Sequence, residues 1–168
     1  MANAIHAVVR TDDMTGTDVR SQLVSVKYMG ADKNTPTDID NGHVVLLDKL
    51  MEGEREVYVG TDVAANSKLS DVVLIASPEV MYDERLKNLS DFYNEAGTIA
   101  RGYHIPLGDT FSVTGEALDG TKKVGDVVEL ATGTKLTSAA SGSGATVVGR
   151  IVKIEKVGRY TYYAIKVD

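Results

Sequence analysis

The chain has 168 residues, of which 24 are acidic and 18 are basic, for a formal net charge of −6. This length suits one ordinary domain or two small ones, and the acidic balance argues against nucleic acid as a partner. The chain contains no cysteine, which excludes disulfides, cysteine-ligated zinc and thiol nucleophiles.

The N-terminal stretch AIHAVVR (residues 4–10) is short and apolar, and a turn-rich segment, DDMTGTD, separates it from the rest of the chain. It predicts either an edge strand of the protein's own sheet or an arm that pairs with the sheet edge of a partner. In the second interpretation, the side chains that contact the partner are Ile5, Val8, Val9 and Arg10.

Residues 1–13 lack the basic and long apolar regions of a signal peptide. A membrane span needs about 18 consecutive apolar residues, and no apolar run in the chain approaches this length. We therefore expect synthesis in a cytoplasm and no membrane partner.

Short apolar runs between turn-forming residues follow in the first half of the chain. Val24, Val26 and Tyr28 recur at period two, which predicts a strand. Residues 30–42 are rich in Gly, Asp, Asn and Thr and predict a loop. Further strands are predicted in the runs HVVLLDKL (43–50), VYVGTDV (57–63) and SDVVLIASP (70–78), the first of them buried on both faces.

Residues 78–96 allow two interpretations. Apolar and aromatic side chains recur there at steps of four and three, as on one face of a helix: Tyr82, Leu86, Leu89, Tyr93 and Ala96. Ser77 would cap this helix and Gly97 would end it. The same stretch is rich in turn formers, so an irregular segment remains an equal alternative.

After Gly97 the sequence predicts β-structure to the end. A loop of small residues, TSAASGSGAT (137–146), is expected to be exposed and mobile. Gly158 supplies the turn between two strands in residues 147–167. The other predicted strands lie in IARGYHI (99–105), DTFSVT (109–114) and GDVVELA (125–131).

These elements predict a mainly β protein, built as a small β-sandwich or barrel with at most one substantial helix, over 78–96. We divide the chain into an N-terminal arm with the first strand (residues 1–30) and a β-rich body (31–168). In an alternative division of the body, residues 121–168 are a separate small C-terminal β-subdomain.

The candidate chemical groups are sparse. The three histidines (His6, His43 and His104) show no metal-ligand spacing. His43 lies near Asp38 and Asp40 in DIDNG, which suggests an acid–base pair or, more plainly, a turn before a strand. DIDNG also fails the spacing of a calcium loop. The sequence therefore predicts no catalytic residue, no metal site and no cofactor.

Charge is distributed unevenly along the chain. Asp32 to Val57 has seven acidic residues against three basic ones, and Val147 to Val167 has five basic residues against one acidic. This asymmetry suits docking on a patterned protein surface, and it equally suits a solvated monomer. Basic residues interleaved with tyrosines, as at the C-terminus, can bind single-stranded nucleic acid, but the acidic chain favours a packed hairpin.

Several motifs resemble those of a known family. The resemblance covers roughly residues 38–130. The motifs that carry it read DIDNGHVVLLDKL, EREVY, PEVMYDE, DFYNEAG, ARGYHIPLGDTFSVT and VGDVVELATG, the last of which ends at Gly133. They resemble small capsid decoration, or cement, proteins that tailed bacteriophages of Gram-positive hosts encode beside the major capsid protein. The N-terminal segment and the small-residue loop lie outside this resemblance.

The resemblance implies a virion structural protein on the outer surface of the mature capsid. Such a protein binds the major capsid protein, stabilises the lattice, and has no catalytic motif. Self-association on the capsid is a further expectation. The alternative is a small β-barrel binding module of the phage head, such as a head-fibre base or a binder of host glycans or another ligand; an enzyme ranks last.

Overall fold

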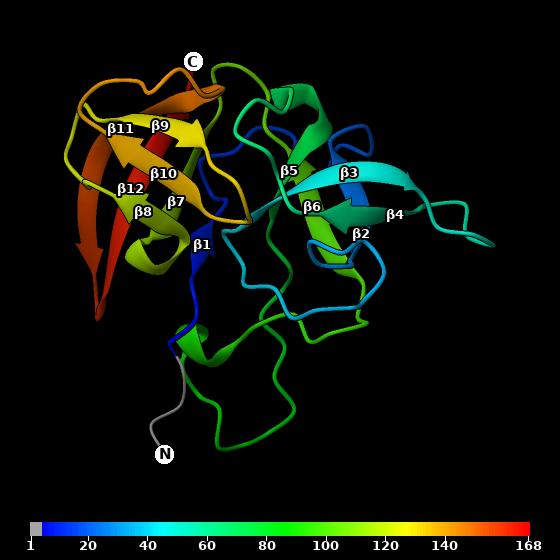
Figure 1. Ribbon diagram of the computed structural model, residues 1–168. Coiled ribbons are helices and arrows are strands. Elements are labelled where there is room, and N and C mark those ends of the chain that lie inside the picture. Colours follow the sequence, from blue (N-terminus) through cyan, green and yellow to red (C-terminus); the bar gives the residue numbers. More distant parts are fainter. Residues whose placement is uncertain (1–4) are drawn as a thin grey trace.

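The computed structural model describes residues 5–168, which form two β-sheets lying side by side (Figure 1). These residues contain twelve strands and three short 3-10 turns but no α-helix, so the prediction of a mainly β protein is confirmed. Within the same residues, no helix is long and apolar enough to cross a membrane.

The first sheet is a closed five-stranded barrel. It needs glycine at Gly60 and Gly102, because a Cβ atom at Gly60 would lie 2.5 Å from Val26 Cγ1, and one at Gly102 would lie 3.0 Å from Val73 Cγ2. These close approaches keep the barrel narrow. Its strands, in spatial order, are β2 (Leu23–Tyr28), β4 (Val57–Thr61), β3 (Val44–Leu50), β5 (Val72–Ile75) and β6 (Ala100–His104).

The second sheet has seven strands and takes them from both ends of the chain. It therefore joins parts of the segments 1–30 and 121–168, which the sequence analysis separated, in one sheet. Its strands, in spatial order, are β1 (Val9–Arg10), β7 (Thr110–Thr114), β12 (Tyr160–Val167), β11 (Val147–Val157), β9 (Val127–Leu130), β10 (Leu136–Ala139) and β8 (Leu118–Gly120).

One hydrophobic cluster joins the two sheets. Val44 and Leu74 of the barrel are fully buried in the same cluster as Phe111, Ile151 and Ile165 of the seven-stranded sheet. Apolar burial is the main favourable term in folding, and a shared core couples the two sheets in one stable unit.

The strands predicted in residues 43–50, 57–63 and 70–78 are present as β3, β4 and β5. The expectation that the first of these is buried on both faces holds only for its first three residues, His43 to Val45. Burial falls toward Leu50, which is 41% exposed, because this end of β3 leaves the core.

A helix over 78–96 is not formed. This segment is irregular apart from a 3-10 turn, η2 (Leu89–Asp91). Its predicted apolar face has no core to pack against, and Tyr82 is 95% exposed. A helix needs tertiary packing of its apolar face for stability, so the turn formers prevail here.

The loop predicted at 137–146 is shorter than expected, because its first three residues, 137–139, belong to strand β10. The rest of it, residues 140–146, is anchored by a buried carboxylate. Glu129, on β9, accepts hydrogen bonds from the Ser143 N–H (2.9 Å) and from the Ser143 hydroxyl (2.7 Å). These bonds hold the pKa of Glu129 below its ordinary value of 4.5. At Ser143, therefore, the loop is held against the sheet.

Glu129→Gln is expected to lower the free energy of unfolding by about 1–2 kcal/mol at neutral pH, because a charged hydrogen-bond acceptor becomes neutral. Since the folded pKa is lowered, the ionised group stabilises the fold above its unfolded pKa, and this contribution is lost as the pH falls through the folded pKa. Urea unfolding at neutral and acidic pH should show a smaller acid-induced loss in the variant. An equal loss in both proteins would contradict this role.

A candidate binding groove beside the long connection

The connection between β5 and β6 is unusually long. These strands pair directly, with Leu74 opposite Tyr103, yet the chain between them runs from Ala76 to Ile99 as the green loop below the sheets in Figure 1. Loops beyond about 12–15 residues without regular structure are uncommon in compact domains, and an ordered one is usually functional. The connection is therefore the candidate functional region of the fold.

The DIDNG stretch holds the far end of this connection. The Asp38 carboxylate accepts a hydrogen bond from the Ala96 N–H (2.7 Å). Ile39 and Asn94 exchange two backbone hydrogen bonds of 2.9 and 2.8 Å. These bonds replace the regular pairing that the irregular backbone lacks.

The same stretch also holds the near end. The buried side chain of Asn41 donates to the Ser77 carbonyl (2.8 Å) and accepts from the Ser77 N–H (2.9 Å). The Asn94 side-chain amide donates to the Asn41 side-chain carbonyl (3.2 Å). Asn41 therefore joins both ends of the connection through one side chain.

Asp40 ties the N-terminal segment to the same place. Its carboxylate contacts His6 Nδ1 (2.7 Å) and accepts from the Ala7 N–H (2.9 Å). The His6 ring stacks on Tyr93 at a centroid distance of 4.6 Å. The partner of Asp40 is thus His6 and not the nearby His43.

His43 immediately precedes strand β3 and is mostly buried. Its Nδ1 lies 3.0 Å from the Thr134 hydroxyl oxygen, and burial lowers its pKa. The structure does not bring His43 into hydrogen-bond contact with Asp38 or Asp40. Of the two interpretations of DIDNG, the turn before a structural strand describes this geometry.

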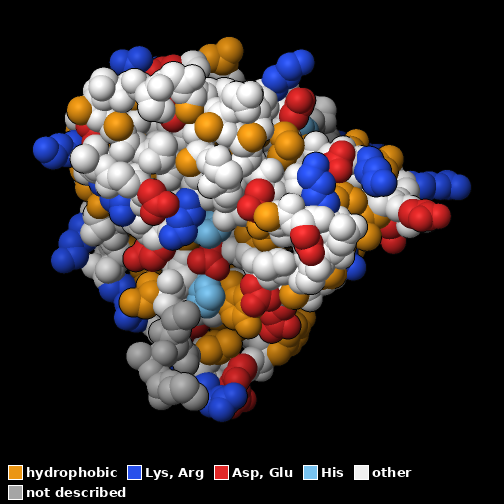
Figure 2. All heavy atoms as spheres, viewed as in Figure 1, with side chains coloured by type: hydrophobic (Ala, Val, Ile, Leu, Met, Phe, Trp, Pro, Cys, Tyr) orange, Lys and Arg blue, Asp and Glu red, His pale blue; other side chains and the backbone are white. Residues whose placement is uncertain are grey.

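A groove of about 860 Å³ lies between the connection and the barrel. Strand β2 contributes Leu23 and Val24 to its wall, and the connection contributes exposed apolar side chains: Val80 is 59% exposed and Ile99 is 57% exposed. Figure 2 shows hydrophobic side chains interspersed with acidic ones over this lower part of the molecule. The groove therefore offers apolar contact area to a partner.

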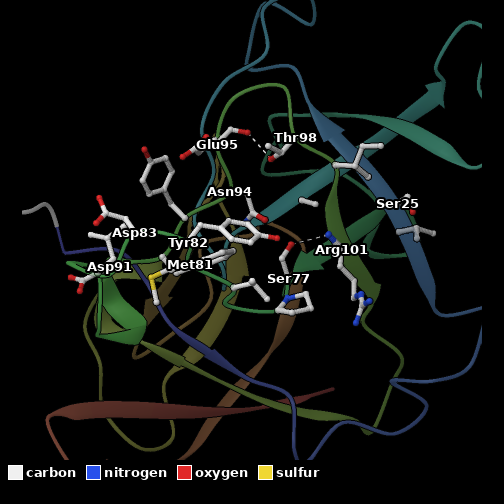
Figure 3. A pocket seen from close by; sticks show the side chains of 18 of the residues that line it. Ser25, Ser77, Met81, Tyr82, Asp83, Asp91, Asn94, Glu95, Thr98 and Arg101 are labelled. Carbon is white, nitrogen blue, oxygen red and sulfur yellow. Dashed lines mark hydrogen bonds between the residues drawn. The ribbon is translucent and has the colours of Figure 1, made fainter.

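The two ends of the groove differ in charge. Asp83 and Asp91 lie at one end and Arg101 lies at the other (Figure 3). Hydrogen bonds from Arg85 lower the pKa of Asp83 to about 2, and the Asn88 N–H lowers the pKa of Asp91. Both carboxylates are therefore ionised at neutral pH.

This lining supports non-covalent binding. Among residues 5–168, no three histidine, aspartate or glutamate side chains are grouped so that they could hold a metal ion. The apolar wall suits an apolar side chain of a partner. Asp83 is already paired with Arg85 (2.6 Å), so Asp91 is the carboxylate that suits a positive charge of the partner.

The residues predicted to contact a capsid lie in two environments. Val8 and Val9 are buried, at 2% and 8% exposure, and Val9 pairs with Val113 of β7. Ile5 is 72% exposed, and Arg10 lies over the Tyr162 ring. The described part of this segment thus forms an edge strand of the protein's own sheet, which is the alternative to a free arm.

The groove was not predicted from the sequence. Its walls come from β2, β6 and the connection, which only the fold brings together. The length of the irregular stretch between the strands at 72–75 and 100–104 was the one available signal. Comparisons with protein-family models, curated proteins and solved structures find no match to this chain.

Proposed function

We propose that the protein is a capsid decoration protein of a tailed bacteriophage, which binds the outer surface of the mature capsid and stabilises it without catalysis. One observation carries this proposal: the segments that resemble decoration proteins meet at the groove. PEVMYDE (78–84) and DFYNEAG (91–97) form most of the connection's part of the lining, and DIDNG (38–42) fastens the connection.

The groove gives this proposal a physical basis. Its exposed apolar side chains would be desolvated against the major capsid protein, and buried apolar anchors dominate the energy of most protein interfaces. A protein that binds only the mature lattice stabilises that lattice by mass action. Many copies, each adding a modest free energy, would reinforce the whole shell.

Ile99→Asp is expected to weaken binding to mature capsids that lack the protein by about tenfold or more. The reason is that a charge placed in a desolvated interface costs at least about 1.4 kcal/mol, which is one decade in affinity. Co-sedimentation of capsids with increasing protein concentration measures this affinity and the number of copies bound.

Leu107→Asp provides the matched control, because Leu107 is also exposed (78%) but does not line the groove. It should bind capsids like the unmodified protein. Equal binding by both variants would show that the groove is not the capsid-binding surface. The absence of saturable binding by the unmodified protein would refute the proposed function itself.

One observation favours a second candidate, a small ligand-binding module of the phage head. The groove volume of about 860 Å³ lies within the range of about 300–1,000 Å³ typical of small-molecule sites, and Tyr82 and Tyr93 are part of its lining. Saturable binding of host glycans without binding to capsids would favour this alternative.

A further inference from the structure

Half of strand β11 has an open edge. Its first residues pair with β9 as far as Arg150, and a backbone hydrogen bond from Gly125 reaches Ile151. From Val152 to Val157, the described residues provide backbone pairing only from β12, on one side. Figure 1 shows this half of β11 at the outer edge of the sheet.

This open edge carries exposed apolar side chains. Val152 is 42% exposed, Ile154 is 39% exposed and Val157 is 45% exposed. An uncovered edge of this kind is a template for another strand, because its backbone N–H and C=O groups lack partners. The edge therefore suits β-sheet extension.

The side chains along the edge point to two faces. Lys153 and Glu155 lie on one face, since their partners on β12 are Ala164 and Tyr162, and Ile154 lies on the other. Lys153 and Glu155 are 64% and 43% exposed, and their side chains lie 3.0 Å apart. Both charges are therefore accessible to a partner strand.

We propose that this edge pairs with the same edge of a second copy, in antiparallel orientation, about a two-fold axis that passes midway between the two copies of Ile154. In this register Ile154 of each copy faces its equivalent. Lys153 of each copy lies opposite Glu155 of the other, which gives two cross-strand ion pairs on the same face. The inference does not depend on the proposed function.

The charges select this register among its neighbours. In a continuous antiparallel sheet with a two-fold axis, one residue must lie directly opposite the same residue of the other copy. If the axis lay between two successive residues, the opposed side chains would point to different faces of the sheet. An axis at Lys153, Glu155 or Lys156 would place two like charges directly opposite each other. Ile154 is the position in Lys153–Lys156 that avoids this.

The chain has no cysteine, so one introduced thiol reports the register directly. Opposite Cα atoms in an antiparallel pair are about 4.5–5.5 Å apart, within the range that a disulfide spans. Ile154→Cys should therefore form a disulfide-linked dimer under mild oxidation, as measured by non-reducing electrophoresis. Lys156→Cys is the control on the same edge, because its two thiols would be about 14 Å apart.

We expect Ile154→Cys to cross-link at least tenfold faster than Lys156→Cys. Adding Glu155→Lys to Ile154→Cys should abolish this advantage, and adding both Lys153→Glu and Glu155→Lys should restore it. Equal rates for the two cysteine variants would overturn the proposal. A rate that Glu155→Lys leaves unchanged would overturn the ion-paired register.

Discussion

Val8→Asp is expected to lower the free energy of unfolding by about 3 kcal/mol or more, because it places a charge at a buried position of the core. Val8 is only 2% exposed, and its N–H donates to the Thr114 hydroxyl (3.0 Å). Urea-induced unfolding followed by circular dichroism measures the change. Ile5→Asp, at a position that is 72% exposed, should stay within about 0.5 kcal/mol of the unmodified protein.

This pair of variants distinguishes the two interpretations of the N-terminal segment. If the segment is an edge strand, Val8→Asp destabilises the fold, and deletion of Met1–Arg10 does so more severely. If it is an arm that serves a partner, Val8→Asp leaves the stability unchanged and weakens capsid binding. An unchanged unfolding midpoint for Val8→Asp would therefore contradict the packing of β1 against β7.

Local sequence patterns predicted most of the strands. The runs VVLLDKL and VVLI became β3 and β5, because short apolar runs between turn formers can be buried only as strands in a core of this kind. Gly158 has a positive φ of 59° and joins β11 to β12 where the turn was predicted. These features depend on neighbouring residues, which the sequence presents directly.

The connection between β5 and β6 could not be predicted in the same way. Its helical periodicity is a local pattern. Its actual conformation depends on hydrogen bonds that residues 38–41 make with the connection, although these residues lie far back in the chain. Strand β8 was also missed, since its three residues (Leu118–Gly120) are too few for a periodic signal. Most of strand β10 (Leu136–Ala139) was predicted to be a loop, because its small residues resemble those of the loop that follows. The groove is formed by such long-range contacts, so it could not be predicted from local sequence patterns either.

Asn41→Leu is expected to lower the free energy of unfolding by about 2–3 kcal/mol. The substitution keeps the branched shape of the side chain but removes the partners of the Ser77 N–H and the Ser77 carbonyl. It also removes one of the two acceptors of the Asn94 side-chain amide, which keeps the Ile39 carbonyl. Buried polar groups that lose their partners retain the full cost of desolvation. Amide hydrogen exchange should also become faster at Ser77 and through residues 94–96, where the connection is fastened.

Asn66→Leu is the matched control, because Asn66 is exposed and lies outside the groove lining. It should leave both the stability and the hydrogen exchange of the connection unchanged. Because Ser77 lines the groove, Asn41→Leu should also weaken binding to capsids even at temperatures where the protein remains folded. If Asn41→Leu is destabilised while exchange in the connection stays slow, the fastening of the connection does not depend on Asn41. In that case the shape of the groove is set by the remaining contacts from Asp38 and Ile39.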